Sequence, residues 1–127
     1  MSGVQVSDQG EGRAEGAGES ATARLDRMIS HAIDIICDPA RPLESLPQEL
    51  ARLAPEAPAL ELCLALASAA DAVQAVFGGG GDIAQRAQRV WQQAAMVGVE
   101  VHYLAVTGKA HATAADLIRH TPREESE

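Results

Sequence analysis

The residues of this sequence that could support acid–base or metal chemistry are four histidines and two cysteines. His31 and Asp34 are three apart and could pair on one helix face, whereas His102 lies beside an apolar stripe that also passes Trp91. Metal sites that can be recognised locally use spacings such as HxxxH, HExxH or CxxC, and the chain contains none of them. We therefore predict no metal, no cofactor and no enzymatic activity. A ligand site assembled across helices from His102 and Cys63 stays an alternative.

A run of four glycines, Gly78 to Gly81, precedes Asp82 and a helical pattern. A phosphate-binding loop of the P-loop type needs GxxxxGK[ST] after a strand, but here a helical pattern comes before the glycines and no lysine follows them. Glycine accepts the positive φ values that end a helix, and aspartate is a preferred N-cap. We therefore predict a turn between two helices, with Asp82 at the N-cap and Gln85 at N3. An anion bound to the free amides of the second helix is the alternative.

Cys37 and Cys63 are too few for a disulfide framework, and both lie in apolar helical patterns where buried thiols are common. We therefore expect two inert core cysteines. Beside the apolar stripe of residues 83–107, we expect Trp91 to anchor a core or an interface and His102 to be half-buried. We expect the far side of the same helix to be polar, with Gln85, Arg89, Gln92, Met96 and Tyr103.

The charge of the chain disfavours two classes of partner. Its 18 acidic and 10 basic residues give a formal net charge of −8, which repels nucleic acid and anionic membrane surfaces. The first 20 residues lack the basic and apolar regions of a signal peptide. The most apolar stretch, residues 58–77, carries Glu61 and Asp71 and is too polar for a secure bilayer span. We therefore expect a cytoplasmic protein that binds neither nucleic acid nor membrane.

The chain divides into a polar N-terminal tail over residues 1–19, a folded part over 20–120 and a charged C-terminal tail over 121–127. Residues 1–19 are rich in Gly, Ser, Glu and Gln, which bury too little apolar surface to offset their ordering entropy, so we predict disorder there. The folded part contains no convincing strand. We predict an all-α bundle of about five helices, three long and two short, in an up-and-down arrangement.

The helices are predicted from apolar spacing and from capping residues. Two capping boxes are expected, one from Ser45 to Gln48 and one from Thr113 to Asp116. The third helix is apolar on more than one side, which is typical of a central helix with several neighbours. In chain order, the predicted helices cover residues 21–37, a short segment after Ser45, 57–77, 83–107 and a last short segment to about 120.

The fourth predicted helix, residues 83–107, carries the clearest pattern in the sequence. Seven small or branched apolar residues alternate by four and three positions, which is the spacing of a heptad seam. The seam could lie inside the bundle or between two copies, and Trp91 flanks it. The predicted interface residues are Ile83, Ala87, Val90, Trp91, Ala94, Val97, Val101 and Leu104.

The sequence thus favours a non-enzymatic interaction protein, such as a small bacterial-type adaptor, chaperone or regulatory subunit. An alanine-rich chain with 46% hydrophobic but only 2% aromatic residues buries little area per residue, so a partner would stabilise it. We expect self-association as a homodimer through the helix over residues 83–107. The identity of any other protein partner cannot be read from the sequence. The alternative is a helical bundle that binds a small apolar ligand or a metal ion between its helices.

Overall fold

The structure is a computed structural model that describes residues 19–120, without the side chains of Arg119 and His120. Within this range the chain forms five helices and no strand, so the all-α class is confirmed. The predicted tails lie outside the described residues, except for Glu19, which pairs with Arg27. The helices are α1 (Ala21–Ile36), α2 (Leu46–Leu53), α3 (Ala59–Phe77), α4 (Gly81–Val106) and α5 (Ala114–His120).

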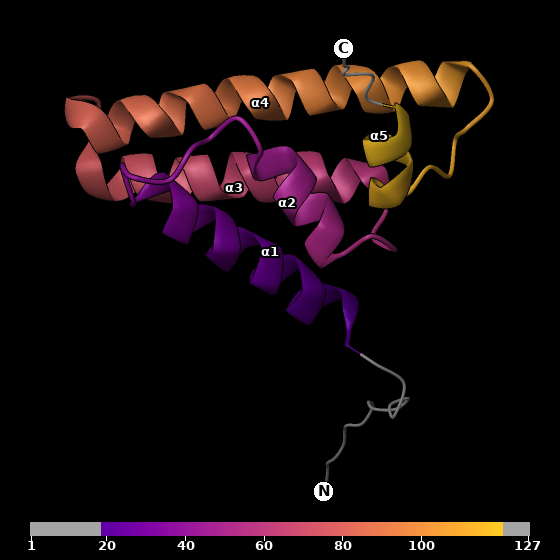
Figure 1. Cartoon of the computed structure of the whole chain (residues 1–127), viewed down its shortest axis with the longest axis horizontal. Helices are drawn as coiled ribbons and strands as arrows, with labels where there is room; N and C mark the ends of the chain where they lie inside the picture. The colour runs from indigo at the N-terminus through magenta and orange to yellow at the C-terminus, as the bar shows by residue number, and fades with distance from the viewer. Residues whose placement is uncertain (1–18, 121–127) are drawn as a thin grey trace, which may run out of the picture.

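Figure 1 shows α3 lying between α1 and α4, with the two short helices α2 and α5 in front of α3 and α4. Helix α3 contacts all four other helices, which confirms its predicted central position. The long helices α3 and α4 are antiparallel neighbours, whereas α1 crosses α3 obliquely (Figure 1). The regular up-and-down arrangement that we expected is therefore not confirmed.

Alanine is the main residue of the core. Twelve of the 25 buried apolar residues in the described part are alanines, and small side chains allow helix axes to approach closely. Most of the largest fully buried side chains come from α1, α2 and α3, including Met28, Ile36, Leu50 and Leu66, whereas α4 contributes only Val90. The core is thus thin between α3 and α4 and thicker where α1 and α2 pack against α3.

Helix α1 begins and ends at defined caps. The Ser20 hydroxyl accepts a hydrogen bond from Ala23 N at 3.1 Å, as an N-cap serine does. The helix ends at Ile36, and Cys37 is its exposed C-cap residue. The prediction that Cys37 is a core cysteine is therefore wrong, because the apolar pattern ends one residue before it.

The first of the two predicted capping boxes is not formed, although Ser45 is the N-cap of α2 as expected. The Ser45 hydroxyl donates to Glu49 Oε2 at 3.0 Å and makes no hydrogen bond to the helix backbone. Glu49 also lies 3.1 Å from His31 Nε2 on α1. The Ser45 hydroxyl therefore binds Glu49 instead of the helix backbone, and Glu49 joins α2 to α1 through His31.

The four glycines form the turn between α3 and α4, as predicted. Gly78 follows the last residue of α3 with a φ of 72°, and Gly81 has a φ of 87°. The predicted N-cap is wrong, because Gly80 takes that position and Asp82 lies exposed in the first turn of α4. Because α4 already begins at Gly81, Asp82 lies inside the helix, past the position from which a side chain caps it.

The other end of the α3–α4 hairpin is closed by hydrogen bonds. Helix α4 ends in a Schellman motif, in which Lys109 N donates to Leu104 O at 2.7 Å and Gly108 has a φ of 105°. An isolated bridge then joins Thr113 to Pro58. One of the two bonds of the second predicted capping box is formed: Asp116 Oδ2 accepts from Thr113 N at 2.8 Å, while the Thr113 hydroxyl donates to the same oxygen at 3.3 Å.

Candidate interaction surface

The predicted seam of α4 lies in the core of the single chain. Five of its positions are buried, and Ile83 and Val101 are partly buried against the same cluster. Val97, the most exposed of the buried five, has 9% of its surface accessible. Burial therefore favours the first of the two readings of the seam, in which its residues pack inside the bundle. The buried five are Ala87, Val90, Ala94, Val97 and Leu104.

Trp91, the eighth predicted interface residue, lies beside the seam at the edge between α4 and α3. Its ring is partly buried, and its indole Nε1 donates to Gln74 Oε1 on α3 at 2.8 Å. Gln74 in turn donates to Gln88 Oε1 at 3.3 Å. The tryptophan therefore anchors the two helices of the hairpin to each other.

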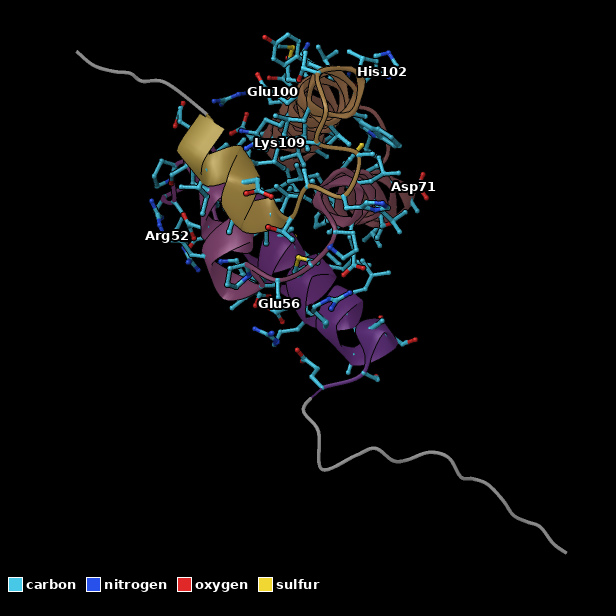
Figure 2. The ribbon with its side chains drawn as sticks, turned by 90° about the vertical axis from the view of Figure 1, so that its right-hand side faces the viewer. Arg52, Glu56, Asp71, Glu100, His102 and Lys109 are labelled. Carbon is cyan, nitrogen blue, oxygen red and sulfur yellow. The ribbon has the colours of Figure 1, made fainter. Side chains whose placement is uncertain are left out.

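The α3–α4 hairpin has a covered side and a bare side. In Figure 2, α5 and α2 lie on one side of the hairpin, and Glu100 points toward that covered side. Asp71 on α3 and His102 on α4 point to the opposite, bare side (Figure 2). Our expectation that His102 would be half-buried is wrong, since its side chain is exposed.

A second apolar row runs along α4, on the side of the helix opposite to the seam. Its residues alternate by three, four and three positions and are each more than half exposed, from 52% at Tyr103 to 66% at Val106. The same spacing continues toward the N-terminus through exposed polar residues, Gln92, Arg89 and Gln85. We call the apolar part, which consists of Met96, Val99, Tyr103 and Val106, the outer stripe.

Helix α3 adds apolar surface on the bare side. Leu60 and Leu64 are at least half exposed, and together with Cys63 and Ala67 they line an open depression of about 540 Å³. Small residues lie where α3 meets α4: a β-carbon at Gly98 would be only 3.7 Å from Cys63 Sγ. The Cys63 thiol donates to Ala94 O at 3.2 Å, so this cysteine belongs to the contact between the two helices.

The covered side of the hairpin is held by polar contacts. Arg86 on α4 donates to Ile36 O at 2.8 Å, to Ile35 O at 2.6 Å and to Arg41 O at 2.8 Å. A cationic donor at these carbonyls satisfies the C-terminal end of α1 and suits the negative end of its dipole. Gln93 also donates to Leu43 O at 2.6 Å. These contacts fix α1 and the following loop against α4.

Two carboxylates join α1 to its neighbours. Arg24 pairs with Glu61 on α3 through two hydrogen bonds of 2.9 Å, and this pairing raises the pKa of Arg24. Burial disfavours the charged form of Glu49, but hydrogen bonds from His31 and Ser45 outweigh it, so the pKa of Glu49 lies below its ordinary value. Both carboxylates join helices to each other, and Glu61 also lines the open depression beside Leu60 and Leu64.

The predicted chemistry residues are dispersed. His31 contacts Glu49 and lies on a different helix from His102, and His111 is exposed in the loop after α4. Over residues 19–120, no three His, Cys, Asp or Glu side chains are grouped closely enough to hold a metal ion. In the part of the chain that the structure describes, the exposed His102 and the half-buried Cys63 do not form a common metal site.

A small cavity lies at the junction of α2, α3, α4 and α5. It is lined mainly by Leu62, Val97, Leu117 and Ile118, with Gln48 and Glu100 at its edge. Its volume of about 50 Å³ is well below the ~150 Å³ of a cavity that binds benzene. The space therefore suits water better than an organic ligand of ordinary size.

One described helix, α3, is long and apolar enough by composition to cross a membrane, with a mean hydropathy of 1.6 in its most apolar window. Core helices of soluble proteins satisfy the same criterion, and α3 is contacted by the four other helices. The expectation that the protein does not enter a membrane stays a prediction.

The outer stripe is the feature that sequence reasoning missed. Its spacing was available in the sequence, but Met96 and Tyr103 were assigned to a polar side of the helix together with Gln85, Arg89 and Gln92. Val99 and Val106 belong to the same row as Met96 and Tyr103. This row is recognised only when its spacing of three and four positions is followed separately from that of the seam.

Comparison of the chain with models of protein families, with curated proteins and with solved structures finds no match.

Proposed function

We propose that the protein is a non-enzymatic protein–protein interaction module that self-associates through α4. The observation that carries this proposal is the outer stripe, in which four large apolar side chains are each more than half exposed on one helix. Single exposed apolar residues are normal on a protein surface. A row of them with heptad spacing is instead the pattern by which one helix packs against another.

The position of the outer stripe supports this proposal. The opposite side of α4 already packs against α3, and Arg86 and Gln93 hold the covered edge of α4 to the loop after α1. Because the core contacts of α4 are made without Met96, Val99 and Val106, packing within residues 19–120 does not explain the apolar character of these residues. A partner that covers them would remove apolar surface from water and stabilise the complex.

The proposed contact is made by the outer stripe of α4, whereas the sequence indicated the seam. The seam residues hold the hairpin together, and the outer stripe contacts the partner. We propose an adaptor, chaperone-like or regulatory role for such a module in the cytoplasm.

The proposal can be tested by photo-crosslinking of the full chain in its native cells. A photoreactive amino acid in place of Val99 should give a discrete crosslinked product whose partner is identified by mass spectrometry. The same amino acid in place of Val76 is the control, because Val76 is 77% exposed but lies at the end of α3, outside the outer stripe.

Crosslinking from position 99 to one reproducible protein, with little product from position 76, would support an interaction module. The absence of product from position 99, or equal and diffuse products from both positions, would overturn it, because the outer stripe would then contact nothing in particular.

A further inference from the structure

We infer that the outer stripe binds the outer stripe of a second copy of this chain, with the two α4 helices antiparallel and centred on residue 101. This inference rests on the proposed function and specifies its partner and geometry. It follows from the order of the apolar residues along α4, from the placement of charge around them and from the path of the chain after α4.

The outer stripe is self-complementary in the antiparallel orientation. When two α4 helices are aligned about residue 101, Met96 of one copy faces Val106 of the other, and Val99 faces Tyr103. Each of the four positions then meets an apolar partner, as the a and d positions do in a helix pair. A two-fold symmetric contact requires this match of a surface with itself.

The charge distribution agrees with a second copy as the partner. A chain with a net charge of −8 must bring two copies together where acidic groups do not face each other. The eleven residues from Met96 to Val106 include one formally charged residue, Glu100. This carboxylate points toward the covered side of the hairpin (Figure 2), where it lines the small cavity beside Gln48. The outer stripe itself is therefore free of charge.

The same distribution favours the antiparallel over the parallel orientation. In a parallel pair, the heptad spacing would place Arg89, which is 53% exposed, against Arg89 of the other copy. In the antiparallel pair, Arg89 lies beyond the end of the partner helix, because α4 ends at Val106. Like charges opposed at such positions destabilise a helix pair.

The chain after α4 leaves the space for this arrangement. The loop from Thr107 to Thr113 turns from the end of α4 toward α5 and α3, away from the outer side of α4 (Figure 1). The N-terminal half of the partner helix can therefore pass the C-terminal end of α4 without meeting that loop. The overlap of residues 96–106 is about 16 Å long, at 1.5 Å per residue.

The contact area indicates a reversible dimer. From their exposed fractions, the four side chains offer on the order of 400 Å² per copy, about half of the ~800 Å² that each partner buries in a standard interface. Neighbouring residues at the flanks, such as Ala95 and His102, enlarge the contact. We therefore expect monomer and dimer to exchange with concentration in the micromolar range or weaker, since small interfaces bind weakly.

The first test is the mass of the full chain by light scattering over a series of concentrations. We expect the mass to rise from 13.3 kDa toward twice that value. The Val99→Glu variant should weaken the dimer by about tenfold or more, as truncation or charging of a central interface residue does. The Val76→Glu variant, which places the same charge on an exposed valine of α3, should dimerise like the unchanged chain.

A second test measures the orientation. In a background with Cys37→Ser and Cys63→Ala, a copy with Val99→Cys should be crosslinked by a short thiol reagent to a tagged copy with Tyr103→Cys. Self-crosslinking of Val99→Cys copies should be weaker. The reverse preference would show a parallel pair and overturn the inference. Circular dichroism of each variant checks that the helices are retained.

The outcomes separate this inference from the proposed function. A mass of 13.3 kDa at every concentration, or a dimer that Val99→Glu leaves unchanged, overturns the second copy as the partner of the outer stripe. If photo-crosslinking from position 99 then identifies a different protein, the interaction module stands, whereas the inference and the self-association in the proposed function fail. If position 99 gives no specific product either, both fail.

Discussion

The two apolar rows of α4 have the same spacing but different surroundings. The inner row, or seam, is built from small residues such as Ala87 and Ala94 and is buried against α3. The outer stripe has larger side chains, including Met96 and Tyr103, and is more than half exposed. Small residues allow α3 and α4 to approach closely, whereas large exposed ones offer contact area to a partner. The comparison shows that spacing alone does not distinguish a core row from an exposed row, because valines occur in both: Val90 and Val97 are buried, whereas Val99 and Val106 are exposed.

The largest difference in stability is expected between substitutions at Val97 in the seam and at Val99 in the outer stripe, two residues later in α4. Val97→Glu places a carboxylate at a position that is 9% exposed, and we expect a loss of about 3 kcal/mol or more in the free energy of unfolding. Val99→Glu should change it by less than about 0.5 kcal/mol. Urea unfolding followed by circular dichroism measures both values. Equal losses would show that the two rows do not differ as described.

A smaller difference in stability is expected between substitutions of two arginines of α4. Arg86→Ala removes three hydrogen bonds to carbonyl groups at the end of α1 and in the loop after it, and we expect a loss of about 2 kcal/mol. Arg89→Ala removes an exposed pair with Glu44 and should cost below about 0.5 kcal/mol. Thermal unfolding of both variants tests this. A larger loss for Arg89 would mean that the outer edge of α4 also supports the fold.

The smallest effect concerns the attachment of α2 to α1 on the covered side of the hairpin. Because the pKa of Glu49 lies below its ordinary value of 4.5, its contribution to stability is complete above that pH and is lost as the pH falls through the lower folded-state pKa. Glu49→Gln should therefore lower stability by less than about 1 kcal/mol at neutral pH, and the difference should shrink in acid. Unfolding midpoints of both proteins between about pH 3 and pH 7 measure it. A difference that grows in acid would contradict this account.

Helix positions could be predicted from the sequence because they depend on local signals. The spacing of Leu62, Leu66, Ala69, Val73 and Val76 predicts one apolar row of α3, of which the first four residues are buried and Val76 is exposed. The turn at Gly78 and the cap between Thr113 and Asp116 also follow from neighbouring residues alone. Caps that compete with tertiary contacts were less predictable. The Ser45 hydroxyl donates to Glu49 instead of capping the backbone of α2, and His31 on α1 also contacts Glu49.

The candidate surface could not be predicted in the same way, because it depends on which side of each helix the other helices cover. Val76 and Leu60 belong to apolar rows of α3, yet both are more than half exposed. Similarly, the three carbonyl groups bound by Arg86 come from residues at least 45 positions away, and no local pattern in the sequence indicates them.

The closure of the α3–α4 hairpin at both ends has a consequence for the order of folding. Four glycines connect its helices at one end, and the bridge between Pro58 and Thr113 joins its open end. Contacts between helices joined by a short turn require little loop-closure entropy and form quickly. The hairpin is therefore expected to assemble first, with α1 and α5 docking afterwards. Because α4 would then present its outer stripe before the rest of the chain is packed, two nascent chains could meet through it while each is still folding.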